Sequence, residues 1–104
     1  MDSQEKQDRA NAIYKRLRLV LAEMESQKHL AASFPAEQLS FNEEMAQIKE
    51  FINVGEAGPA YEVIVATLEQ VPFAILGSAA VALLELGLLF RYKTDRPEDR
   101  WLQE

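Results

Sequence analysis

Carboxylates are the side chains of this sequence whose number and spacing could support chemistry. Six of them lie in the middle of the chain: Glu43, Glu44, Glu50, Glu56, Glu62 and Glu69. General acid–base catalysis needs two carboxylates in one cleft, with surroundings that push their pKa values apart. The helical spacing around these glutamates predicts exposed positions instead. We therefore expect no catalytic residue and no enzyme activity.

Metal ligands and nucleophiles are scarce in this chain. Its 104 residues include no cysteine and one histidine, His29, so a thiolate metal site and a cysteine nucleophile are excluded. A di-iron helical bundle needs Glu-x-x-His pairs, and the sequence has none. We predict no bound metal and no cofactor, and we expect His29 to contact the last carbonyls of a helix.

The net charge of −6 is concentrated in one part of the chain. Residues 30–72 hold seven acidic residues and one base, Lys49, whereas residues 1–29 have a net charge of +1. An acidic protein disfavours nucleic acid and anionic lipid as partners and favours a basic protein. Two interpretations stay open. The acidic stretch either only solvates a surface or forms a docking face for a basic partner, whose association it would accelerate.

The first half of the chain predicts two helices. The first begins at Asp2 or Ser3 and runs to about Gln27, because apolar residues recur at helical spacing along one stripe: Ala10, Ile13, Leu17, Val20, Leu21 and Met24. Pro35 breaks the helical pattern. A capping box formed by Ser40 and Glu43 then starts a second helix, with an apolar stripe at Phe41, Met45, Ile48 and Ile52. This helix is expected to stop at Val54, with Gly55 providing a left-handed exit.

The second half predicts two more helices and a tail. Pro59 suits the first position of a helix that ends near Gln70. Ser78 is expected to cap a short helix that runs through Leu86 and ends at Gly87. Because residues 78–86 are apolar on nearly every side, this helix is predicted to be the central, buried one. Residues 91–104 are expected to form a charged extension with a short helix over 98–102, whose Trp101 contacts the bundle.

The pattern as a whole predicts one all-α domain over residues 1–104. We expect a small antiparallel bundle of about four main helices plus the short C-terminal helix. The apolar run 73–90 has 18 residues, the lower limit for a membrane span, but it contains Glu85, whose burial in lipid would be costly. We therefore interpret this run as a core helix and expect no membrane contact. Residues 1–7 are polar and have no signal region, which predicts a cytoplasmic protein.

A short segment of the chain carries a family resemblance. Residues 55–62 match the pattern Gly-Glu-x-Gly-x-Ala-x-Glu, which resembles the signature of MafI-like immunity proteins, small proteins encoded beside polymorphic bacterial toxins. Residues 48–52 fit the helix that leads into that signature. Residues 71–73 look like the loop that follows, and residues 83–92 look like the last helix of the family and its turn. The resemblance covers roughly residues 45–92 and does not extend to the first helix.

The resemblance implies a cytoplasmic immunity protein that binds and neutralises a cognate toxin domain delivered by a neighbouring cell. Many toxins of this kind are nucleases with basic clefts, which an acidic surface can occupy. We expect the six glutamates to contribute to this surface, foremost those over residues 43–50. For two of them a structural role is the favoured alternative: Glu56 would stabilise helix amides, and Glu62 would make a buried hydrogen bond between helices.

A second function stays open from the sequence. The chain could be a helical adaptor, or a subunit-interaction module, that has no toxin partner. Its apolar segment 73–90 would then form the interface with a partner or with a second copy. The sequence names neither the toxin nor the oligomeric state.

Overall fold

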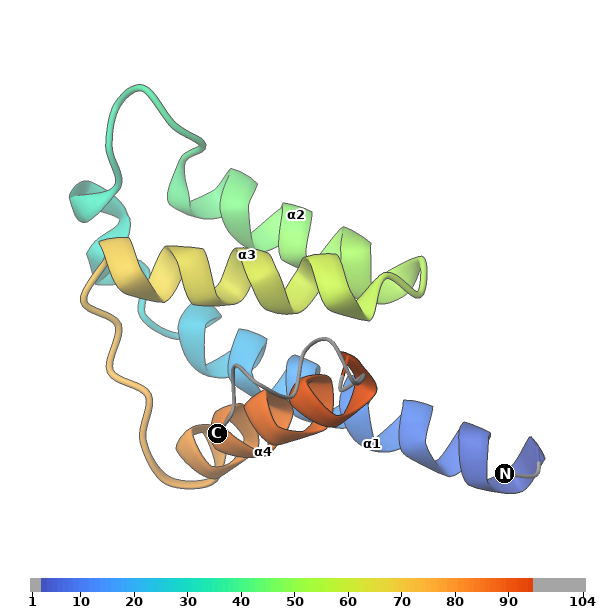
Figure 1. The fold of residues 1–104 in the computed structure, drawn as a ribbon. Coiled ribbons are helices and arrows are strands. Elements are labelled where there is room, and N and C mark those ends of the chain that lie inside the picture. Colours follow the sequence, from blue (N-terminus) through green and yellow to red (C-terminus); the bar gives the residue numbers. More distant parts are fainter. Residues whose placement is uncertain (1–2, 95–104) are drawn as a thin grey trace.

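The protein is an all-α bundle of four long helices. The computed structural model describes residues 3–94, and the side chains of residues 3–90. The long helices are α1 (Ser3–Glu25), α2 (Phe41–Asn53), α3 (Ala57–Gln70) and α4 (Gly77–Thr94), and a 3-10 helix η1 (Lys28–Ser33) follows α1. Each long helix runs opposite to the one before it (Figure 1). The predicted fold class is confirmed, and the predicted helix over 98–102 and Trp101 lie outside the described residues.

Helix α1 occupies the centre of the bundle. It packs against α2, α3 and α4, and five of its six predicted stripe residues are buried: Ile13, Leu17, Val20, Leu21 and Met24. The helix ends at Glu25, slightly earlier than predicted, because the chain tightens there into hydrogen bonds between residues three apart. The Gln27 amide donates to the Met24 carbonyl at 3.0 Å. The 3-10 helix η1, which the sequence did not predict, continues this tightened path and carries His29 at an exposed position.

Both ends of α2 are closed as the sequence predicts. The Ser40 hydroxyl accepts from the Glu43 amide at 3.2 Å, and the Glu43 carboxylate accepts from the Ser40 amide at 2.9 Å, which completes the capping box. At the other end, Gly55 adopts a φ of 81°. The amides of Gly55 and Glu56 donate to the carbonyls of Ile52 and Phe51, at 3.2 and 2.8 Å. This pair of bonds is a Schellman motif, which turns the chain directly into α3.

Helix α3 begins two residues earlier than predicted. Its first residue is Ala57, so Pro59 takes the third helical position and not the first. The prediction was wrong because the first three amides of a helix all lack an intrahelical partner, and proline is tolerated at each of these positions. The buried face of α3 consists of Ala57, Ala60, Ile64 and Thr67. The helix ends at Gln70, as expected from Pro72.

The prediction of a short buried helix over 78–86 is wrong. Helix α4 begins at Gly77, continues through Gly87 and extends to Thr94, so residues 91–94 belong to this helix. Gly87 is not a helix stop but a point of close approach, because a Cβ there would lie 3.4 Å from the Tyr61 hydroxyl oxygen. The Tyr61 ring in turn stacks on Phe90, with ring centroids 4.7 Å apart. The helix is not central either, since it packs mainly against α1 through Ala79, Ala82 and Leu86.

Two contacts fix the long connections. The buried Gln27 side chain donates to the Ala74 carbonyl at 2.7 Å and accepts from the Ala74 amide at 2.8 Å. It therefore ties the end of α1 to the segment that leads into α4. Phe34, Phe41 and Phe73 pack with ring centroids 5.7–6.3 Å apart, which joins the two long connections to the start of α2.

No helix within residues 3–94 combines the length and the hydropathy that a crossing of the bilayer requires.

Candidate protein-interaction surfaces

Four of the six predicted glutamates lie on the outer faces of α2 and α3. Glu43 and Glu50 are seven residues apart on α2, and Glu62 and Glu69 are seven residues apart on α3; all four are exposed. Seven residues are about two helical turns, so each pair shares one face at a separation of about 10 Å along the axis. The buried residues of each helix lie on the opposite side. We call these four residues, together with exposed Glu56 in the turn between the helices, the acidic face.

The members of the acidic face are too far apart along each helix to exchange a proton directly. A general acid or base must lie within hydrogen-bond reach of the substrate proton that it transfers, in a site that excludes bulk water. Spaced, solvated carboxylates suit the recognition of positive charge instead. Residues 41–70 contain six glutamates and one base, Lys49, and this base forms an exposed ion pair with Glu25 of α1 at 3.3 Å.

Glu43 and Glu44 are adjacent in sequence but have different roles. Glu43 closes the capping box and keeps its side chain at the surface. Glu44 is half-buried beside α3, where it lines a cavity of about 180 Å³ with Thr67 and Gln70. Burial raises the pKa of Glu44 above its ordinary value of 4.5. The structure therefore separates Glu44 from the acidic face.

The side-chain hydrogen bonds that the predicted structural roles of two glutamates would use are absent. Glu62 is exposed, so the expected buried hydrogen bond between helices is wrong. Glu56 is the N-cap residue of α3, but its carboxylate makes no capping hydrogen bond. Its carbonyl accepts from the Ala60 amide at 3.1 Å, so the backbone of Glu56 makes the first hydrogen bond of the helix. Both carboxylates are available to a partner.

A second surface lies in the apolar segment 73–90, which the sequence analysis assigned to an interface only under the adaptor alternative and otherwise expected to be buried. On α4, Val81, Leu84 and Leu88 are 54%, 71% and 49% exposed. Their spacing of three and four residues places them on one helix face, opposite to buried Ala79 and Leu86. We call these three residues the α4 strip. The spacing of these residues is visible in the sequence. Because α4 is apolar on nearly every side, however, its sequence does not indicate which side packs against another helix.

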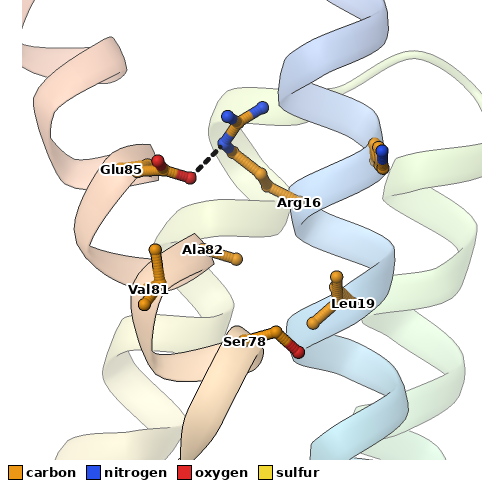
Figure 2. A pocket seen from close by; sticks show the side chains of 7 residues that line it. Arg16, Leu19, Ser78, Val81, Ala82 and Glu85 are labelled. Carbon is orange, nitrogen blue, oxygen red and sulfur yellow. Dashed lines mark hydrogen bonds and ion pairs between the residues drawn. The ribbon is translucent and has the colours of Figure 1, made fainter.

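A pocket borders the α4 strip on the side of α1. Figure 2 shows Leu19 of α1 and Ser78, Val81 and Ala82 of α4 along its wall. Its volume is about 320 Å³. Arg16 donates to Glu85 at 2.7 Å across the pocket and to the Ala12 carbonyl at 2.9 Å. The acid of α4 is thereby neutralised.

No protein-family model, curated protein or solved structure matches the chain. The likeness to MafI-like immunity proteins stays a prediction that depends on the residues that carry it. Within residues 3–94, no three or more acidic or histidine side chains gather in a way that could hold a metal ion.

Proposed function

We propose that this protein is an immunity protein that binds a basic toxin domain through its acidic face and neutralises it. The observation that carries the proposal is the outward position of Glu50, Glu62 and Glu69 on two adjacent helices whose opposite sides form the core. The short signature at residues 55–62 supports it, because that segment forms the turn between α2 and α3 and the start of α3, and it carries Glu56 and Glu62 of this face.

The chemistry of the acidic face fits a phosphate-binding cleft. A nuclease holds the backbone of its substrate with Lys and Arg, so its cleft attracts carboxylates. Long-range attraction between the two proteins accelerates their encounter, and the carboxylates then select the orientation. The inhibitor in this proposal acts by occupying the cleft and needs no catalytic residue of its own.

The scaffold of the acidic face is preorganised. The capping box at Ser40 and the Schellman motif at Gly55 define both ends of α2, and the turn leads directly into α3. Surfaces that are already ordered lose less conformational entropy on binding than loops do. The glutamates of the two helices therefore reach a partner in a defined arrangement.

The experiment starts from the gene next to the one that encodes this chain. The proposal expects a large secreted protein with a variable C-terminal domain. That domain, expressed alone in a bacterium, is expected to stop growth, and co-expression of this chain is expected to restore it. Growth arrest that persists despite full expression of the chain would contradict the proposal.

The acidic face is tested with charge reversals. Glu62→Lys combined with Glu69→Lys is expected to slow association with the toxin domain by about tenfold or more, because both charges lie on the proposed contact surface. A matched control is Asp8→Lys combined with Glu37→Lys, which changes the net charge equally at exposed positions elsewhere. Equal slowing by both variants would assign the effect to net charge and remove this face from the proposal.

One observation favours the adaptor function as a second candidate. The α4 strip leaves large apolar side chains in contact with solvent, and such patches are typical of interaction sites. An adaptor that uses only this strip would keep full affinity for its partner when the acidic face is reversed. An immunity protein of the proposed kind would lose affinity.

A further inference from the structure

The α4 strip is the most exposed apolar feature among the described side chains of the long helices. Leu84 and Leu88 point away from α1, Val81 lies at the rim of the pocket between α4 and α1, and Leu76, directly before the helix, is 70% exposed. Together the four side chains present roughly 400 Å² of apolar surface, a size at which surface patches of monomers are often functional. Nothing in the packing of α4 against α1 requires these side chains to be apolar.

The spacing of the α4 strip suits a second helix. Residues that alternate at intervals of three and four form a straight seam when two helices cross at about 20°. The strip is short, at about 10 Å from Val81 to Leu88. Leu84 lies near its middle, so an antiparallel helix that crosses there would meet both halves of the strip equally.

Charge decides which partner can approach this helix. The whole chain has a net charge of −6, so two copies repel each other, most strongly where residues 41–70 face one another. Residues 77–90 of α4 contain one charged residue, Glu85, and Arg16 neutralises it at 2.7 Å. The α4 strip is therefore a surface on which two copies can meet without opposing acids.

The apolar area of two facing strips suits a weak dimer. Two facing strips of three exposed side chains each would remove about 600 Å² of apolar surface, and because interfaces between identical subunits are about 65% apolar, the whole interface would bury about 900 Å². That value lies below the range of stable, specific protein–protein interfaces, about 1,200–2,000 Å², and in the range of weak, transient contacts.

We infer that the α4 strip is a homodimer interface, in which α4 of one copy packs antiparallel on α4 of a second copy around a two-fold axis near Leu84. In this arrangement Leu88 of the second copy lies opposite Val81 and can enter the pocket beside Leu19 and Ala82. The contact is isologous, so it closes at two copies. The acidic face, which lies on α2 and α3, stays free in the dimer.

The mass of the full chain in solution tests this inference. Between about 1 and 300 µM, the range for weak dimers, sedimentation equilibrium is expected to show a rise from the monomer mass of 11.8 kDa toward twice that value. Leu84→Glu is expected to remain monomeric throughout, because it places an acid at the two-fold axis. The matched control, Val54→Glu, changes the C-cap residue of α2, which is 58% exposed, and this variant is expected to dimerise like the natural chain.

A monomeric mass at every concentration would overturn the inference, as would a Leu84→Glu variant that dimerises as well as the natural chain. Assembly beyond two copies would also overturn it, because an isologous contact closes.

A cysteine cross-link provides a second readout that does not depend on the stability of a variant. The natural chain has no cysteine, so Leu84→Cys introduces a single thiol near the proposed axis. Mild oxidation at a concentration at which the natural chain dimerises is expected to link most of this variant into a disulfide dimer, and Val54→Cys under the same conditions is expected to link much more slowly. Equal rates for the two variants would argue against the antiparallel contact.

Added salt separates this inference from the proposed function. Salt screens the repulsion between two copies of charge −6, so dimer affinity is expected to hold or to increase. The complex with a basic toxin is expected to weaken under the same change. A dimer that dissociates on addition of salt would contradict the apolar interface and would leave the acidic face untouched.

Discussion

The bundle has two outer surfaces, one on α2 and α3 and the other on α4, and their exposed side chains differ in polarity. Helices α2 and α3 bury an apolar side and turn glutamates outward, whereas α4 is apolar on the side that faces away from α1. Helix α1 packs against all three of these helices (Figure 1). An amphipathic outer surface is what folding and solubility require. Folding and solubility do not require an apolar outer surface, so its presence indicates an interaction with a partner.

The largest expected difference in stability is between the alanine variants of two leucines on α4. Leu86 is fully buried and Leu84 is 71% exposed. Leu86→Ala is expected to lower the free energy of unfolding by about 2–5 kcal/mol, because it removes packed methyl groups and leaves a cavity. Leu84→Ala should change it by no more than about 0.5 kcal/mol in the monomer.

Chemical denaturation at low protein concentration measures both leucine variants. Similar losses for the two would show that the outer side of α4 is part of the fold and would remove the contrast between the two surfaces.

The next effect concerns the hydrogen bonds between the Gln27 side chain and the backbone of Ala74, in the segment before α4. Gln27→Ala removes the side-chain bonds to both backbone groups of Ala74 and leaves those groups without their partner. We expect a loss of about 1–3 kcal/mol in the free energy of unfolding. The exposed Gln38 provides a control, since Gln38→Ala should change little. Equal thermal stability of the two variants would mean that water replaces Gln27 at no cost.

A smaller effect separates the capping role of Glu43 from its proposed role in toxin recognition. Ser40→Ala is expected to cost about 1 kcal/mol, because the cap of α2 is lost. Glu43→Gln keeps an acceptor for the Ser40 amide and removes the charge, so stability should be almost unchanged. Thermal unfolding measures both variants. A Glu43→Gln variant that retains its stability but binds the toxin more weakly would assign the carboxylate of Glu43 to recognition.

The smallest effect concerns the pH response of Glu44. Burial raises the pKa of Glu44 in the folded protein above 4.5, so the folded state holds this proton more tightly than the unfolded state does. Ionisation of Glu44 therefore lowers stability as the pH rises through this range. Glu44→Gln should be slightly more stable than the natural chain at pH 7, and the difference should vanish at a pH well below 4.5.

The matched control for Glu44 is Glu50→Gln, at an exposed position of the same helix. Thermal unfolding across pH should show no comparable trend for this variant. A Glu44→Gln variant that is less stable than the natural chain at neutral pH would show that the charge of Glu44 is paired in solution.

The candidate surface was predictable in part. The apolar stripes in the sequence predict that Ile48 and Ile64 are buried. Glu50 lies two residues after Ile48 and Glu69 lies five residues after Ile64, and these spacings place both glutamates on the outer side of their helices. The inward position of Glu44 does not follow, because it depends on α3 lying next to that side of α2. For the same reason the sequence could not predict the exposure of the α4 strip.

The sequence by itself determined the features that depend on neighbours within about four residues. These include the stripe of α1, the capping box at Ser40 and the left-handed exit at Gly55, since local backbone geometry and hydrogen bonds create them. Only the tertiary structure decided that α1 is central and that α4 is peripheral. The local sequence of a helix that is apolar on every side is compatible with a central or a peripheral position. Which of the two it takes depends on which of its sides the other helices cover.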